Sequence, residues 1–244
     1  MPITVLASGT ENLFARHFGM SGHPERVGET ILGGRTIPLD LAQTPDCRFA
    51  LMAGIGFDAD VVTRHHQSRL GRAGKALPTN RIAYVLPLLG SSWSYRFPPL
   101  EITVTDPGPE ERLVGSMAFV FNLPRYALGL PIAPEARGDD GWLDLVVFRD
   151  PGPFQALHYL WLVFRGLHLG QAGVEHRRVR RVTATAAERV PVQLDGDPRG
   201  TVPKAGDSSP WFAKVVPGAL KVLVGPEYSG PTLSFQGLDA RRST

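Results

Sequence analysis

The sequence has very little cysteine and no long apolar run. Cys47 is its only cysteine, which excludes an intrachain disulfide framework and, with no His/Cys cluster beside it, a thiolate zinc site. Arg, Gly or Pro interrupts every apolar stretch, so no window is long enough for a membrane span. Residues 1–7 lack the basic region and sustained apolar stretch of a signal peptide. We therefore expect a soluble protein of the reducing cytoplasm that is free to touch a membrane surface.

Glycine and proline, by contrast, are abundant. The 27 Gly and 22 Pro together make up about a fifth of the 244 residues, against a usual share of roughly 12%. This favours many turns and short strands over a helix bundle. Hydrophobic residues at 43% and charged residues at 20% are typical of a globular chain. The net charge of +3 permits anionic partners such as phosphate or lipid headgroups without identifying one.

The order of apolar and turn-forming residues predicts a mainly β chain with a small α/β start. A short strand at residues 3–6 precedes helices at 11–19, with Thr10 as N-cap, and at 24–32. Two further helices, at 81–93 and 154–169, interrupt the β pattern. Residues 226–244 have low apolar density and are predicted to be loosely ordered. Strands are predicted over residues 36–41, 48–53, 100–105, 114–122, 142–148, 174–184, 190–194 and 220–224.

A Gly-Thr turn at Gly9 and Thr10 lies between the first strand and the first helix. Such a turn exposes backbone N–H groups and the positive end of a helix dipole, both of which suit a phosphate. The alternative is that Thr10 only caps the helix.

Two acidic turns are candidate sites. In residues 139–144, DDGWLD, the adjacent Asp139 and Asp140 suit a hard cation such as Mg²⁺; the alternative is an ordinary Asp-Gly turn. In residues 194–197, LDGD, Asp195 and Asp197 follow a buried strand and could accept a proton from a substrate hydroxyl. A plain hairpin turn explains the second pair equally well.

A basic run, HRRVRR, occupies residues 176–181. It could hold an anionic lipid surface or a phosphate. The alternative is a solvated edge strand protected by its charge.

Four motifs in this order resemble the diacylglycerol kinase family of lipid kinases, which includes sphingosine and ceramide kinases. They are GTENLFA (9–15), AGIGFDA (53–59), APEA (133–136) leading into DDGWLD (139–144), and VQLDGD (192–197). The similarity runs from about residue 2 to about residue 225. NAD kinase, a distant relative, fits less well because the motifs of the sandwich follow the lipid-kinase pattern.

The resemblance implies a nucleotide-binding lobe, a β-sandwich and an active site between them. Thr10 would contact the nucleotide, and Asp197 would be the base that deprotonates the lipid hydroxyl attacking the γ-phosphate. Asp140 would hold Mg²⁺ with the carbonyl oxygens of Arg137 and Trp142. The resemblance thus implies Mg²⁺ as cofactor, ATP as co-substrate and a lipid substrate at a membrane surface, to which the cytoplasmic protein is peripheral. No nucleic acid is expected, and a second copy of the chain is a possible partner.

The chain departs from the family at three places. A Gly-Gly-Asp-Gly-Thr loop precedes the Gly-Thr turn in the family and is not found here, Leu13 stands where many members have Asp, and Asp197 replaces Glu. We therefore expect residues 1–40 to be a remnant of the nucleotide lobe, 41–225 an antiparallel β-sandwich with two inserted helices, and 226–244 a tail. Little or no ATP-dependent phosphorylation is expected from this chain. The alternative function is a kinase-derived sandwich that binds lipid or protein without catalysis.

Overall fold

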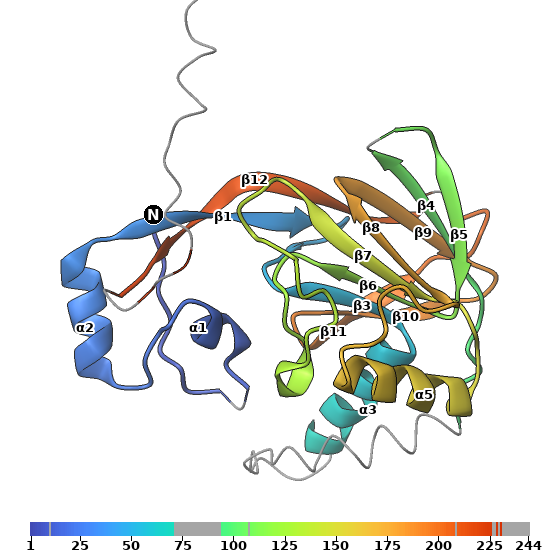
Figure 1. Ribbon diagram of the computed structural model, residues 1–244, viewed down its shortest axis with the longest axis horizontal. Coiled ribbons are helices and arrows are strands. Elements are labelled where there is room, and N and C mark those ends of the chain that lie inside the picture. Colours follow the sequence, from blue (N-terminus) through green and yellow to red (C-terminus); the bar gives the residue numbers. More distant parts are fainter. Residues whose placement is uncertain are drawn as a thin grey trace, which may run out of the picture.

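Two six-stranded antiparallel sheets form a β-sandwich, as predicted (Figure 1). A computed structural model describes residues 1–9, 11–70, 94–106, 108–207, 209–225, 228 and 230. The first sheet has the order β2 (Arg48–Phe49), β1 (Thr36–Gln43), β12 (Trp211–Leu223), β9 (Arg181–Ala186), β4 (Leu100–Asp106) and β5 (Glu111–Gly115). The second has the order β11 (Asp197–Val202), β10 (Val190–Leu194), β3 (Met52–Gly56), β6 (Met117–Phe121), β7 (Leu143–Phe148) and β8 (Val174–Val179).

The main core lies between the two sheets. On β4 the buried side chains alternate with more exposed ones, because successive residues of a strand point to opposite faces. Leu100 and Ile102 of the first sheet meet Val120 and Leu145 of the second in one buried cluster. The same alternation of apolar and polar residues in the sequence predicts these strands.

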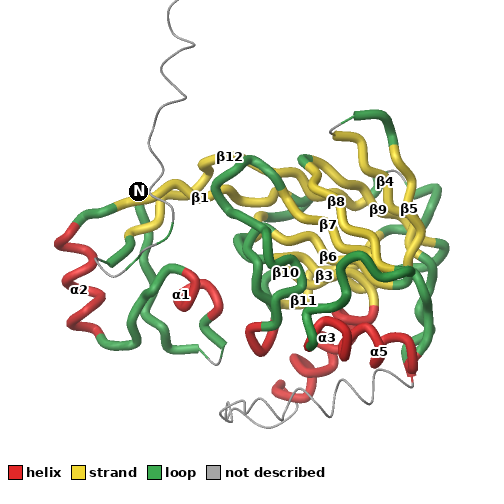
Figure 2. The backbone as a smooth tube through the Cα atoms, viewed as in Figure 1, coloured by secondary structure: helices red, strands yellow, loops and turns green. Residues whose placement is uncertain are grey.

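The second sheet is covered on both faces. All residues of β3, β6 and β7 are buried, because α3 (Phe57–Leu70) and α5 (Pro153–Phe164) pack on the face turned away from the first sheet (Figure 2). Phe148 of β7 contacts Tyr159 of α5 with ring centroids 4.8 Å apart. Strands buried on both faces read as continuous apolar runs.

The N-terminal segment forms a small unit at one end of the sandwich. It contains α1 (Leu13–His17) and α2 (Pro24–Gly33), and β1 and β12 extend to it (Figure 1). Phe18, Leu39 and Val222 belong to its buried cluster. Pro24 starts α2 and Gly34 ends it with φ 63°, as the sequence predicts.

The first elements differ from their predictions. The strand expected at residues 3–6 is reduced to one bridge, between Ile3 and Val222. The helix expected over 11–19 spans only Leu13–His17, and Asn12 takes the N-cap position that was assigned to Thr10. Thr10 itself lies outside the described residues, as does the helix predicted over 81–93. The tail prediction falls almost wholly outside them too.

Three predicted strands are each divided into two. Residues 48–53 give β2 and β3, 114–122 fall on β5 and β6, and 174–184 on β8 and β9. At each break, at residues 50–51, Ser116 and Arg180, the chain passes from one sheet to the other, a corner that the apolar pattern does not mark. The sequence missed α3 and β11, and described α5 as longer. The domain boundary expected at residue 40 falls within β1 and stays a prediction.

Candidate functional site

A tight hairpin joins β10 to β11. Leu194 pairs with Asp197, and the two residues between them, Asp195 and Gly196, have φ of 52° and 91°. Positive φ at both central residues is the signature of a two-residue type I′ turn. The hairpin-turn interpretation of residues 194–197 is therefore confirmed, and Asp197 is exposed at the start of β11.

The two carboxylates of this hairpin have different surroundings. Asp195 accepts three hydrogen bonds from backbone N–H groups at the corner between β2 and β3, at 2.8, 2.8 and 3.0 Å, from Ala50, Leu51 and Met52. Asp195 thus holds the chain corner to the hairpin. Both carboxylates line the same cavity, and Asp195 is the one that these three hydrogen bonds hold to the backbone.

A cavity of about 400 Å³ lies between the hairpin and the N-terminal segment. Its walls include Gly9, Glu11 and Leu13 on one side and Gln193 and Asp197 on the other. The fold therefore brings the segment around the Gly-Thr turn and the LDGD hairpin to one cleft.

A buried carboxyl group stands beside this cleft. Asp58, in the first turn of α3, is 6% exposed and accepts hydrogen bonds from the Tyr126 hydroxyl and from Nε2 of Gln193, the latter at 2.8 Å. Burial raises the pKa of Asp58, and the two donors oppose that rise. A methyl group on Gly54 would lie 1.9 Å from Oδ2 of Asp58, so the glycine of β3 leaves the space that the carboxyl group fills.

An apolar cavity lies on the other side of Asp58. It measures about 80 Å³, room for roughly five to eight water-sized groups. Asp58 and Tyr126 are among its few polar neighbours, and Tyr126 also lines the 400 Å³ cleft. Its apolar walls include Phe57, Val61, Met117, Phe119, Leu157, Leu160 and Val163.

The Asp58, Tyr126 and Gln193 network therefore separates an apolar cavity from a polar cleft. None of these three residues was among the candidates that the sequence offered. Asp58 and Gln193 lie inside the AGIGFDA and VQLDGD motifs, so the resemblance to the family could have pointed to them. Tyr126 lies in no motif, and nothing in the sequence marks it.

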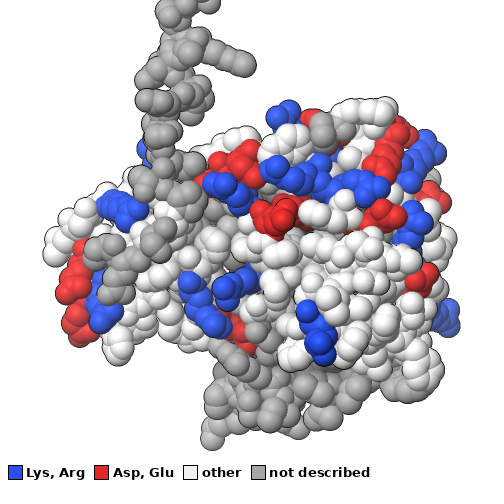
Figure 3. All heavy atoms as spheres, in the orientation of Figure 1, with Lys and Arg blue, Asp and Glu red and all other residues white. Residues whose placement is uncertain are grey.

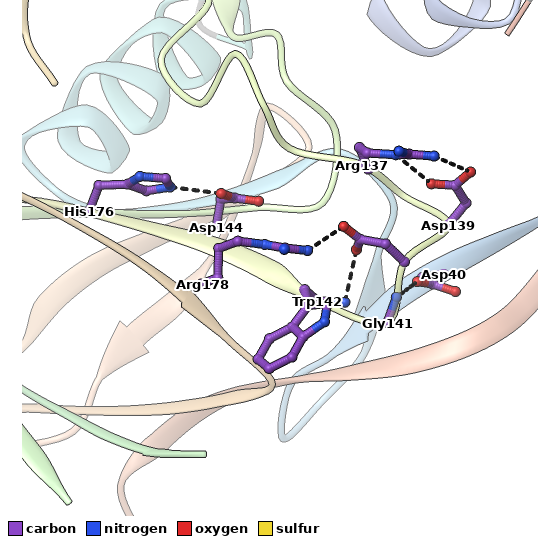
Figure 4. A network of polar contacts seen from close by, with 9 residues as sticks. Asp40, Arg137, Asp139, Gly141, Trp142, Asp144, His176 and Arg178 are labelled. Atoms are coloured by element: carbon purple, nitrogen blue, oxygen red, sulfur yellow. Dashed lines mark hydrogen bonds and ion pairs between the residues drawn. The ribbon is translucent and has the colours of Figure 1, made fainter. Parts of the chain in front are cut away.

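Polar contacts form a network around the acidic turn at residues 139–144 (Figure 4). Asp140 forms an ion pair with Arg178 and accepts the Trp142 N–H at 3.1 Å, while Asp139 pairs with Arg137 at 3.2 Å. Desolvation raises the pKa of Asp140, and the Arg178 charge opposes this.

Two more carboxylates complete the network. Asp144 pairs with Nε2 of His176 at 2.7 Å. Asp40 is 4% exposed and accepts the N–H groups of Gly141 and Gly218, each at 2.7 Å. Asp40 thereby ties the turn to the irregular pairing between β1 and β12.

Asp140, the residue predicted to hold Mg²⁺, is paired with Arg178 in the structure. The guanidinium of Arg178 already neutralises Asp140, so a second cation could approach only if Arg178 moved away. No group of three or more His, Cys, Asp or Glu side chains that could hold a metal occurs in the described ranges. Mg²⁺ at Asp140 with the carbonyl oxygens of Arg137 and Trp142 stays a prediction.

The basic run at residues 176–181 is used within the fold. It lies on β8, an edge strand of the second sheet, and continues into β9. Besides the pairs of His176 and Arg178, Arg177 binds Glu111 at 2.8 Å and the Arg180 guanidinium lies 4.4 Å from the Trp142 ring centroid. These contacts favour the edge-strand interpretation over a phosphate site.

Within the part of the chain that the structure describes, no helix combines the length and apolar character that crossing a membrane requires.

Comparison with known proteins places the chain in a family. Residues 52–224 match the model of the YegS C-terminal NAD kinase beta sandwich-like domain. A diacylglycerol kinase of Mycobacterium tuberculosis is 28% identical over 233 residues, covering 91% of this chain and 69% of the relative. A diacylglycerol kinase of Bacillus subtilis is 24% identical over 205 residues, covering 82% and 63%.

A solved structure shares the fold. The crystal structure of a diacylglycerol kinase from Bacillus anthracis superimposes with a TM-score of 0.58 at 15% identity, over 93% of this chain and 68% of that one. With the family model covering most of the chain, these matches confirm the resemblance carried by the four motifs. The chain belongs to the diacylglycerol kinase family of lipid kinases, with a sandwich of the YegS C-terminal type.

Proposed function

We propose that this chain forms the lipid-binding side of an ATP-dependent kinase site that transfers the γ-phosphate of ATP to a lipid hydroxyl. The observation that carries the proposal is the shared wall between the two cavities. Tyr126, Asp58 and Gln193 separate an apolar cavity from the cleft that Asp197 lines. A molecule that is apolar at one end and carries a hydroxyl at the other matches this arrangement.

The proposed reaction is a direct transfer. The lipid hydroxyl gives its proton to the Asp197 carboxylate as its oxygen attacks the γ-phosphorus of ATP. The bond from that phosphorus to the β,γ-bridging oxygen breaks, and ADP leaves with the electron pair. ATP enters as its Mg²⁺ complex, in which the metal spreads the negative charge of the phosphates.

The buried network of Asp58, Tyr126 and Gln193 orients the lipid in this proposal. The apolar cavity would take the first methylene groups of an acyl chain, and its small volume leaves the remainder of the chain outside. Asp58, held by Tyr126 and Gln193, acts in this proposal as a positioning residue that fixes the wall beside the reacting hydroxyl. Contact of Thr10 with the nucleotide, low turnover by residues 1–244 alone, and a cytoplasmic site of action at the membrane stay predictions.

The test is transfer of labelled γ-phosphate from ATP to diacylglycerol in detergent micelles, measured on the chain preceded by a segment that carries the family's Gly-Gly-Asp-Gly-Thr loop, because little or no turnover is expected from residues 1–244 alone. Asp197→Asn is expected to lower the rate by roughly 10²–10⁴, the usual contribution of a general base, while Asp197→Glu, which restores the family residue, retains or raises it. Glu101→Gln is the matched control, because Glu101 is an exposed carboxylate on β4 of the other sheet.

An Asp197→Asn variant as active as the wild-type chain would remove Asp197 from the mechanism. Binding of diacylglycerol without transfer by any variant would support the alternative, a sandwich that binds lipid without catalysis.

A further inference from the structure

Helix α5 is apolar on both of its faces. Its twelve residues include no charged side chain, and Ala156, Tyr159 and Leu162 are buried on the inner side. On the outer side Trp161 is 51% and Phe164 is 74% exposed. A surface helix of a water-soluble domain normally carries charged residues on its outer face, so an apolar outer face indicates a partner.

The apolar surface continues beyond the helix. Leu167, just after its end, is 48% exposed, and residues 151–174 contain no Asp or Glu. Most of the surface over α5 is uncharged in Figure 3, in contrast to the charged rows over β7 and β8.

The few polar side chains of this face suit an anionic lipid surface. Arg165 places its guanidinium 5.8 Å from the Trp161 ring centroid, and His158 stacks on the same ring at 6.1 Å. Trp beside Arg is typical of the membrane interface, where the indole lies among the headgroups and the guanidinium reaches lipid phosphates. A cationic residue with no acidic neighbour in this segment complements a negatively charged bilayer.

The same helix also lines the apolar cavity. Leu157, Leu160 and Val163 of α5 form part of the cavity wall, one helix face away from Trp161 and Phe164. An acyl chain that left a bilayer in contact with α5 would reach the cavity along the helix without crossing bulk water.

We infer that the outer face of α5 is the surface with which this protein docks on an anionic phospholipid bilayer, through Trp161, Phe164 and Leu167 with Arg165 at the headgroups. The purpose of this docking rests on the proposed function, because it delivers the lipid to the site. The docking itself is measured without ATP.

The experiment is co-sedimentation of the full chain with vesicles of phosphatidylcholine mixed with phosphatidylglycerol, and with vesicles of phosphatidylcholine alone. Wild-type chain is expected to bind the mixed vesicles more tightly. Phe164→Glu is expected to weaken that binding about tenfold, since it removes an inserted ring and adds a charge of the wrong sign. Arg165→Gln should weaken binding to the mixed vesicles only. Leu32→Glu is the matched control, because Leu32 is 89% exposed on α2.

Three results would overturn the inference. They are no binding of the wild-type chain to mixed vesicles, binding by Phe164→Glu as tight as that of the wild-type chain, and a loss of binding in Leu32→Glu as large as that in Phe164→Glu. A dimer that Phe164→Glu dissociates, with no vesicle binding, would assign the face to a protein partner instead. Thermal unfolding of each variant establishes that it is folded.

Docking and catalysis can fail separately. Asp197→Asn is expected to bind vesicles like the wild-type chain. Vesicle binding without any phosphoryl transfer by the protein that carries the Gly-Gly-Asp-Gly-Thr loop would refute the proposed function and leave the docking surface. Transfer by that protein to a short-chain, water-soluble diacylglycerol without vesicle binding would refute the docking surface and leave the proposed function.

Discussion

Gly54 leaves the space that the buried carboxyl group of Asp58 occupies, so its replacement by alanine tests the centre of the site. Gly54 lies on β3, paired with Gln193 on one side and Phe119 on the other. The added methyl carbon would lie 1.9 Å from Oδ2 of Asp58 and 2.7 Å from Nε2 of Gln193. Both side chains must move, because heavy atoms cannot approach this closely.

The expected loss follows from the contacts that this movement breaks. Asp58 accepts hydrogen bonds from Tyr126 and Gln193, and a hydrogen bond to a charged group contributes about 1.5–3 kcal/mol. Replacing Gly by Ala where the backbone conformation allows it stabilises a protein by about 0.4–1 kcal/mol, because the unfolded chain loses conformational entropy. We therefore expect Gly54→Ala to lower the free energy of unfolding by about 2–5 kcal/mol, a large part of a domain's usual 5–15 kcal/mol.

Urea unfolding followed by circular dichroism measures this loss. Gly28→Ala on α2 is the control, since no atom lies within 4 Å of its added methyl, and helix propensity predicts a gain of up to about 1 kcal/mol. In the double variant Gly54→Ala/Asp58→Ala the clash with Asp58 is gone, so its loss should be smaller than the sum of the single losses. A Gly54→Ala loss under about 1 kcal/mol, or strict additivity, would refute this account of the site.

The remaining predictions concern Asp195, Asp197, Asp140 and the pH dependence due to Asp58. Asp195→Ala leaves three backbone N–H groups without their acceptor and should lower the free energy of unfolding by about 2–4 kcal/mol, whereas Asp197→Ala should change it by less than about 0.5 kcal/mol; urea titration compares the two. Removal of Mg²⁺ by a chelator should leave the melting temperature of the wild-type chain unchanged, because Arg178 neutralises Asp140. Arg178→Ala should make melting respond to Mg²⁺, and adding Asp140→Asn should abolish the response. Burial raises the pKa of Asp58, so its contribution to stability is full below the ordinary Asp pKa of about 3.9 and is lost as pH rises through the folded-state value. In Asp58→Asn this part of the pH dependence of unfolding should disappear.

The sandwich was predictable because most strands are bounded by glycine or proline and show either alternation or an apolar run. The corners at which the chain passes from one sheet to the other were not predictable, because neither Ser116 nor Arg180 by itself indicates a turn. Their positions depend on which strands the chain pairs with after each corner, which is a property of the whole fold.

The motifs predicted where the residues of the candidate site lie in the sequence, but not which contacts each of them makes. Asp195 and Asp197 flank one glycine and look equivalent in the sequence. Both line the cleft, and the hydrogen bonds that Asp195 accepts from the chain corner distinguish the two. For Asp140 the sequence predicted Mg²⁺, which stays a prediction, and gave no sign of the ion pair with Arg178, a residue 38 positions away. Long-range pairing of this kind has no local signature.

The place of β12 in the first sheet has a consequence for synthesis of the protein. β12 is the last described strand in the sequence, yet it lies between β1 and β9, so β1 has no long partner until residues 211–223 have left the ribosome. At about 5–20 residues per second, this interval lasts on the order of ten to thirty seconds. Throughout that time the apolar face of β1 is open to wrong partners, and the nascent chain depends on chaperones or on temporary contacts within the N-terminal segment to protect it.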